Sequence, residues 1–334
     1  MGMAFVAAMV AIVCGCGPTT LTIGATPAHQ RLSKTTVRDD GRAFGPEIAI
    51  IDVTGLILNA DRPGLLSEGE NPVSDLYEKL EAARSDRAVR GVILRINSPG
   101  GGVTASDAMY RSVLRFKESG KPIVALMMDV AASGGYYVAC GADEMIAYPT
   151  CVTGSVGVIM QTVTFKPALS RLGIHAEAFT SGPNKDAGSP LSNMTDEHRA
   201  VLQELVDDFY QRFVKLVRER RRTIAEQDFA TVTDGRVVSG TDAAELGLVD
   251  RTGDLEDAFK AAKDRAGVAD ADLVVYRRRL EYVGSPYSVA PSRESAGRRV
   301  GTQINLLQIN GAGVPMGPQT GFYYLWQQGG TSMP

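Results

Sequence analysis

The short stretch Asp129–Tyr137 constrains this chain more than any other part of its sequence. It reads Asp-Val-Ala-Ala-Ser-Gly-Gly-Tyr-Tyr and follows the apolar run Pro122–Met128, which is typical of a buried strand. A serine between two alanines and two glycines, where a strand turns into a helix, has little bulk around its hydroxyl. Ser133 is therefore a candidate nucleophile, although an ordinary helix N-cap would explain the same residues.

A second strand-to-helix turn carries three consecutive glycines. The predicted strand 91–97 runs directly into Ser-Pro-Gly-Gly-Gly at 98–102, and a helical pattern follows over 103–118. Glycines in such a loop let the backbone approach a ligand closely and point its amides at an oxyanion. The spacing matches neither GxxxxGK[ST] nor GxGxxG, which argues against a phosphate site. A plain tight turn is the alternative interpretation.

Strand and helix patterns alternate through the central part of the chain, which indicates an α/β fold. The helix that begins at Thr195 carries acidic residues in its first turn and arginines in its last, and its apolar face predicts a core or subunit contact. The remaining patterns predict strands over 47–58, 144–148, 175–180, 248–250 and 272–277, and helices over 73–86, 166–173, 195–222, 241–246 and 254–266.

The composition predicts a globular protein and narrows its partners. The chain has 334 residues, of which 44% are hydrophobic, so it can bury a full core. A net charge of -3, without a basic stripe interleaved with aromatic residues, argues against binding to nucleic acid. The four cysteines form no paired CxxC motifs, so we expect no metal site, and we expect Cys140 and Cys151 to be small buried apolar residues.

The two ends differ in composition from the middle. Residues 1–30 contain no Asp, Glu, Lys or Arg and hold a short apolar run before Cys16, which predicts a signal or lipoprotein leader lipidated at Cys16, or else an uncleaved anchor. Residues 31–46 are predicted to be a linker and 281–334 a flexible tail, whose aromatic end would dock on a neighbour. The catalytic domain would then be 47–280 and would lie outside the cytoplasm.

A serine nucleophile needs a base, and histidine is scarce. His29 lies in the leader or linker, His175 has no acidic motif arranged to orient it, and His198 falls in the first turn of a helix, where a solvated face is the simplest interpretation. The alternative base is Lys185, in a Gly/Pro loop. A lysine acts as a base only when its surroundings favour the neutral amine, for example by desolvation. The simplest alternative is a surface lysine.

Taken together, the motifs resemble the signal peptide peptidase A family, bacterial serine-lysine peptidases also called protease IV. The resemblance covers the chain from about Glu47 to Ala266. The spacing of Lys185 after Ser133 matches the short, single-repeat form of the family, in which one domain carries both residues of the dyad. Five motifs in the expected order carry it: Ser-Pro-Gly-Gly-Gly at 98–102, Ala-Ala-Ser-Gly-Gly-Tyr-Tyr at 131–137, Thr-Gly-Ser-Val-Gly-Val at 153–158, Ser-Gly-Pro-Asn-Lys-Asp at 181–186 and Asp-Gly-Arg-Val at 234–237.

The resemblance implies a Clp-protease/crotonase-like fold, a spiral of strand-strand-helix units, and a role for each motif. Ser133 would be the nucleophile, Lys185 the general base and Ser155 the hydroxyl that orients the lysine. Gly101 and Gly134 would offer backbone amides to the oxyanion. The implied substrates are apolar peptides, namely signal peptides left in the membrane, and the implied assembly is a homo-oligomeric ring. No cofactor is implied.

Two other functions fit parts of the same pattern. A crotonase-like acyl-CoA enzyme uses a similar glycine loop but would need neither Ser133 nor Lys185. A catalytically silent scaffold of the same fold would assemble membrane partners without any hydrolysis. A serine-directed fluorophosphonate probe and a peptide ester distinguish these functions from a peptidase.

Overall fold

The computed structural model describes residues 32–41, 45–60, 71–278, 285–288 and 321–326. The leader predicted at 1–30, Cys16 and His29 lie outside the described residues. In chain order the elements are β1 (Ser33–Arg38), β2 (Glu47–Thr54), α2 (Pro72–Ser85), β3 (Val89–Ser98), β4 (Gly100–Gly102), α3 (Val103–Lys117), β5 (Ile123–Ala132), α4 (Gly134–Ala139), β6 (Glu144–Ala147), β7 (Val152–Gly154), β8 (Ile159–Met160), α5 (Lys166–Arg171), α6 (Asp196–Arg220), α7 (Glu226–Val232), β9 (Val237–Ser239), α8 (Gly240–Glu245), β10 (Arg251–Thr252), α9 (Leu255–Ala266), β11 (Asp272–Arg277) and β12 (Phe322–Leu325).

A mostly parallel sheet forms the core, with strand order β1-β11-β2-β3-β5-β6-β10. Its central strands read as continuous apolar runs because both faces of the sheet are covered. Along β2, Ile48 and Ile50 pack in the cluster that includes α9, whereas Ala49 and Ile51 pack in the cluster that includes α2, α3 and α4. This alternation follows from the two-residue period of a strand. The predicted α/β class is confirmed.

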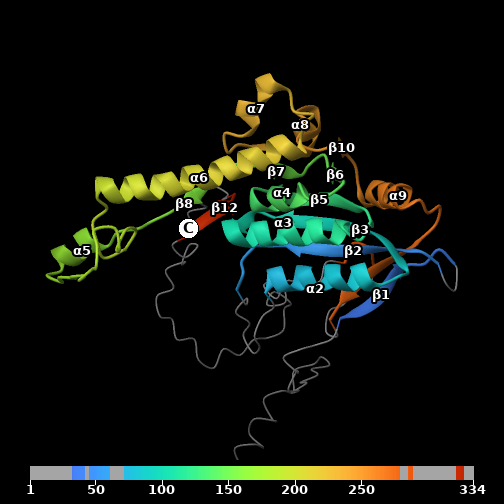
Figure 1. Cartoon of the computed structure of the whole chain (residues 1–334), viewed down its shortest axis with the longest axis horizontal. Helices are drawn as coiled ribbons and strands as arrows, with labels where there is room; N and C mark the ends of the chain where they lie inside the picture. The colour runs from blue at the N-terminus through green and yellow to red at the C-terminus, as the bar shows by residue number, and fades with distance from the viewer. Residues whose placement is uncertain (1–31, 42–44, 61–70, 279–284, 289–320, 327–334) are drawn as a thin grey trace, which may run out of the picture. The chain divides into compact units, whose positions relative to one another are not determined.

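The helices on the α2 side begin where the sequence predicts. Asn71 caps α2 by accepting hydrogen bonds from the amides of Val73 and Ser74, and Pro72 occupies the first helical position, where a missing amide is harmless. Helix α3 begins immediately after the three glycines of β4. In Figure 1, α2 and α3 lie side by side, in contact with each other.

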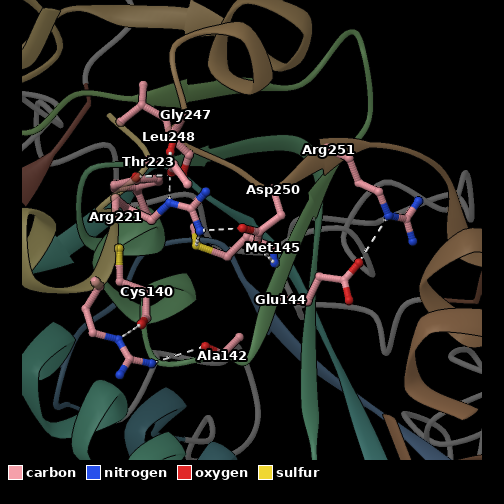
Figure 2. Close-up of polar contacts among 12 residues, drawn as sticks. Cys140, Ala142, Glu144, Met145, Arg221, Thr223, Gly247, Leu248, Asp250 and Arg251 are labelled. Atoms are coloured by element: carbon pink, nitrogen blue, oxygen red, sulfur yellow. Dashed lines mark hydrogen bonds and ion pairs between the residues drawn. The ribbon is translucent and has the colours of Figure 1, made fainter. Parts of the chain in front are cut away.

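Two arginines hold the C-terminal end of α6 against the core. The Arg221 side chain donates to the carbonyl of Gly247 at 3.0 Å and to the Asp250 carboxylate at 2.9 Å (Figure 2). Arg220 donates to the carbonyl of Cys140, the residue that ends α4, at 2.8 Å. Guanidinium groups in the last turn also complement the negative end of the helix dipole. The end of α6 is therefore held against the helix that begins after Ser133.

The N-terminal half of α6 and the segment before it bury few apolar side chains. On the predicted apolar face of α6, Phe213 and Leu216 are buried, but Val201 and Leu205 are exposed. The strand predicted over 175–180 is wrong: these residues have no regular structure, and the Phe179 side chain is 97% exposed. A segment forms a strand only when it pairs with another strand, and none of the described strands pairs with these residues. None of the described helices is both long and apolar enough to cross a membrane.

Both predicted flanking segments contribute to the fold. Within the segment predicted as a linker, Ser33–Arg38 forms the edge strand β1, antiparallel to β11, and its half-exposed polar side chains explain why it lacks an apolar pattern. Two residues of the predicted tail, Pro286 and Ser288, accept hydrogen bonds at their carbonyls from Arg95 of β3, at 2.6 and 2.9 Å. The aromatic end of the tail, which was expected to dock on a neighbour, forms β12 within the fold.

Candidate active site

Ser133 stands at the junction of β5 and α4, as the sequence predicts. Its side chain is 1% exposed, and Oγ has no hydrogen-bond partner among the described residues. Its backbone φ is 52° and ψ is -114°, a region that residues with a Cβ rarely occupy. Strain of this kind costs on the order of 1–3 kcal/mol and persists where the surrounding structure enforces it, most often at functional sites.

Ser155 occupies the equivalent position at the end of the neighbouring strand. Strands β5 and β7 are parallel with Ala132 opposite Gly154, and the Ser133 amide donates to the Gly154 carbonyl at 2.8 Å. Ser155 has a φ of 51° and is also buried. Within the described ranges, these two serines are the only residues other than glycine with a positive φ. The structure therefore brings together two of the residues predicted for the site.

The two candidate oxyanion donors also meet beside Ser133. A Cβ built on Gly134 would lie 3.1 Å from the Gly101 amide nitrogen and within clash distance of Ser106 Oγ. A Cβ built on Gly100, whose φ is +102°, would lie 2.6 Å from the Gly134 amide nitrogen. Only glycine permits so close an approach of the two backbone segments. The amides of Gly101 and Gly134 thus lie near each other, as an oxyanion hole requires.

Hydrogen bonds from side chains hold the glycine turn in this position. Ser98 Oγ donates to the Gly55 carbonyl at 2.6 Å and accepts from the Gly100 amide at 3.1 Å. On the far side of the turn, Ser106 Oγ donates to the Gly102 carbonyl at 3.0 Å. Because Ser98 and Ser106 are fully buried, these bonds are shielded from competing water.

Lys185 is not joined to the other site residues within this chain. It lies exposed in the loop that connects α5 to α6, and no hydrogen bond or ion pair among the described residues links it to Ser133 or Ser155. The neighbouring carboxylate of Asp186 faces other groups: a hydrogen bond from the Ser192 side chain lowers the pKa of Asp186, and His198 lies 3.7 Å away. Ser133, Ser155 and the amides of Gly101 and Gly134 therefore lie together within one chain. Lys185 is not in contact with them.

His198 is buried, contrary to the solvated face that its place in the first helical turn suggested. Its Nε2 lies 2.7 Å from the Pro183 carbonyl, so the ring ties the start of α6 to the loop that carries Lys185. Thr195 Oγ1, which caps α6, accepts from the His198 amide at 3.1 Å. Sequence reasoning missed this contact because it depends on how the loop folds back. Cys140 and Cys151 are buried, as predicted.

A cluster of aromatic side chains adjoins the nucleophile, and the sequence did not predict it. Tyr137, one turn after Ser133, stacks on Tyr324 of β12 with ring centroids 5.1 Å apart. Phe213 of α6 contacts both rings, at 5.0 and 4.7 Å. The repeated tyrosines of 136–137 were a signal of packing, but the partners come from distant parts of the chain.

The profile of peptidase family S49 matches residues 115–269 of this chain, and the Clp protease profile matches residues 53–161. The first range includes Ser133, Ser155 and Lys185, and the second includes the glycine turn. The Clp protease match confirms the Clp-protease-like fold that the family resemblance implies.

Several named proteins are similar over most of the predicted catalytic domain. A protein of Enterococcus faecium whose assigned name is signal peptide peptidase SppA is 34% identical over 237 residues, 70% of this chain and 68% of its own length. Protease 4 of Salmonella typhi is 33% identical over 70% of this chain, a match that spans only 37% of that longer protein. The chloroplastic serine protease SPPA of Arabidopsis thaliana is 33% identical over 66% of this chain and 33% of its own length.

Among solved structures, a mutant of the 1510-N membrane-bound stomatin-specific protease aligns with 66% of this chain and 85% of its own, with a TM-score of 0.42 and 13% identity. The extent and identity of the sequence matches establish the family. The chain belongs to peptidase family S49.

Proposed function

We propose that the chain is a membrane-associated serine endopeptidase in which Ser133 is the nucleophile and Lys185 the general base. The observation that carries this proposal is the strained, buried Ser133, whose Oγ has no partner and which lies beside the amides of Gly101 and Gly134. An acyl-CoA enzyme or a silent scaffold would gain nothing from the strain at Ser133.

The proposed reaction gives each of these residues a role. Ser133 Oγ attacks the peptide carbonyl while its proton passes to the neutral amine of Lys185, which Ser155 orients. The negative charge that develops on the carbonyl oxygen is stabilised by the amides of Gly101 and Gly134. The lysine then protonates the leaving amine, and water hydrolyses the acyl-enzyme by the reverse sequence.

The lysine reaches Ser133 from a second copy of the chain. Within one chain Lys185 is exposed, and the segment around it presents a set of unpartnered apolar side chains, which favours a subunit contact there. This set comprises Val163, Phe165, Leu172, Ile174, Phe179, Val201 and Leu205. A ring of such contacts would complete one site for each subunit and would deliver each lysine to a neighbour.

The substrates and the location complete the proposal. Apolar peptides, including signal peptides left in the membrane, are the substrates that the sequence resemblance implies. The leader with Cys16 would hold the catalytic domain at the membrane, on the extracytoplasmic side of a bacterial envelope. Mass spectrometry of the purified N-terminus tests lipidation of Cys16 directly.

Hydrolysis of an apolar peptide ester tests the dyad and its assembly. The Ser133→Ala and Lys185→Ala variants should each lose activity, and an equimolar mixture of the two, after subunit exchange, should regain part of it. Lys215→Ala, which removes an exposed lysine of α6, is the matched control and should retain full activity. Inactive single variants whose mixture stays inactive would contradict a lysine supplied by a second copy. An active Ser133→Ala variant would refute the nucleophile itself.

A further inference from the structure

We infer that His198 is a positioning residue for the proposed base. It holds the loop 181–189, which carries Lys185, against the first turn of α6, so that the lysine is presented to its serine in one orientation. This inference rests on the proposed function and adds a residue to the chain that supplies the lysine. His198 acts through the loop and not on the reacting atoms.

His198 is buried in a part of α6 that is otherwise exposed or half-buried. Its side chain is 5% exposed, and within the described helix it is the only buried residue before Phe213. Histidine is seldom buried without a polar partner, because its ring nitrogens lose their hydrogen bonds to water. The contacts of this ring therefore indicate what it does.

The His198 ring contacts the loop on both sides of Lys185. Before the lysine, Nε2 lies 2.7 Å from the Pro183 carbonyl oxygen. After the lysine, the same nitrogen lies 3.7 Å from Asp186 Oδ1. The Lys185 side chain itself is exposed. One buried ring thus fixes the residues that flank the lysine and leaves the amine free to reach a serine.

A second contact joins the same two segments, but it is more exposed. Asn184 Nδ2 donates to Glu197 Oε1 at 2.9 Å, and Glu197 is exposed. Water competes with a hydrogen bond at the surface more than with one made by a buried ring. We therefore expect His198 to contribute more than Glu197 to the position of the loop.

The hydrogen bond to the loop also determines the form of the ring. A carbonyl oxygen only accepts, so Nε2 carries the hydrogen and Nδ1 is left as an acceptor. Nδ1 is buried and has no partner among the described residues. His198 is the third residue after the Thr195 cap, where a Glu or Gln would reach back to the cap in a capping box. The ring makes no such bond, and its one hydrogen bond goes to the loop.

Loss of the ring should lower kcat and leave KM unchanged. Without the contact to Pro183 the loop no longer holds Lys185 in one place, and a misplacement of about 1 Å costs up to about a hundredfold in rate. We expect kcat of His198→Leu for a peptide ester to fall about tenfold or more. KM should stay within about twofold of the parent, because the residues proposed to hold the substrate are unchanged.

Rescue by a conservative variant tests the role of the hydrogen bond. The side-chain amide of His198→Gln can donate to the Pro183 carbonyl, so its kcat should return to within about threefold of the parent. Arg199→Leu, which changes an exposed residue of the same helical turn, is the matched control and should keep the parent kcat. A parent-like kcat in folded His198→Leu, or a His198→Gln no better than His198→Leu, would overturn the inference.

Mixed copies distinguish positioning from a general loss of structure. In a mixture of Ser133→Ala and Lys185→Ala, the first chain supplies the lysine and the second the serine. His198→Leu added to the first chain should lower the restored activity about tenfold or more, whereas His198→Leu added to the second should leave it unchanged. Equal losses in both arrangements would assign His198 a purely structural role and overturn the inference.

Failure of the proposed function gives a different result. A parent that hydrolyses no ester, or a Lys185→Ala variant that stays active, would refute the dyad itself. If the parent is active and Lys185→Ala is not, the comparison of His198→Leu with His198→Gln decides the inference even where a mixture regains no activity.

Discussion

Replacing Gly101 by alanine should disable the oxyanion hole by displacing the glycine turn. A Cβ at this position would lie 2.6 Å from the Ile57 carbonyl carbon and 2.7 Å from the Ile57 nitrogen. These are backbone atoms, which cannot turn aside as the end of a flexible side chain can. Ordinary contact begins near 3.4 Å, and the Ile57 carbonyl oxygen would lie closer still to the added Cβ than the carbonyl carbon does. The two backbone segments must therefore separate by more than 0.8 Å, the difference between 3.4 and 2.6 Å.

A displacement of this size moves the Gly101 amide away from the oxyanion. Loss of one such donor costs about a hundredfold or more in kcat, equivalent to roughly 2.7 kcal/mol, and a misplacement of about 1 Å has a similar effect. We therefore expect kcat for a peptide ester to fall at least a hundredfold in Gly101→Ala. The reaction rate of Ser133 with a fluorophosphonate should fall as well, because that reagent also develops charge on an oxygen.

Gly102→Ala is the matched control, since it adds the same methyl group one residue away. A Cβ there would be 3.8 Å from the Ala105 Cβ and 3.9 Å from the Ile57 oxygen, which is ordinary contact. Its kcat should stay within about threefold of the parent, a change of less than 1 kcal/mol. The reasoning is refuted if Gly101→Ala, shown to be folded by its thermal transition, keeps a kcat within that same threefold range.

The remaining predictions concern stability. Arg95 now donates to the buried Asp52 carboxylate at 2.5 and 2.9 Å. Arg95→Met leaves that carboxylate without its partner, so urea unfolding should show that the free energy of unfolding falls by about 3–5 kcal/mol. Burial raises the pKa of the Cys140 and Cys151 thiols from 9.0 to about 12. Between pH 9 and 12 the unfolded chain therefore loses these protons while the folded chain keeps them. The free energy of unfolding should fall over this range by about 1.4 kcal/mol per pH unit for each thiol. A variant with both Cys140→Ala and Cys151→Ala should lose stability less steeply as the pH rises. An equally steep loss would contradict the assignment of this pH dependence to the two thiols. Ser155→Gly removes the positive-φ strain, so the melting temperature should rise, by the equivalent of about 1 kcal/mol, while kcat falls; a lower melting temperature would contradict the strain.

The sequence predicts the parts of this site that depend on local structure. Ser133 follows β5 directly, and Gly101 is the third residue after β3, so the strand pattern places both at the end of the sheet. Adjacent parallel strands then bring Ser155 beside Ser133, as the pairing of Ala132 with Gly154 requires. The close approach of Gly101 and Gly134 is likewise the reason these positions are glycine.

The parts that the sequence did not predict depend on contacts between distant segments. β12 pairs with β4 although the two come from far apart in the chain, and its aromatic residues could equally have packed on another molecule. His198 was expected in solvent because its helical turn is polar. The loop that carries Pro183 folds back onto this turn, and the Pro183 carbonyl lies 2.7 Å from His198 Nε2. The strand expected over 175–180 lacks a neighbour to pair with, which a local pattern does not reveal.

The central claim is that Ser133 is the nucleophile of this peptidase, and covalent labelling tests it most directly. The full chain would be treated with a fluorophosphonate, digested and mapped by mass spectrometry, beside Ser133→Ala and Ser106→Ala, which changes a buried serine in contact with the glycine turn. We predict one labelled residue, Ser133, in the parent and in folded Ser106→Ala, and no label in Ser133→Ala. Labelling that persists in Ser133→Ala, or a parent that hydrolyses peptide esters with no label on Ser133, would contradict the account.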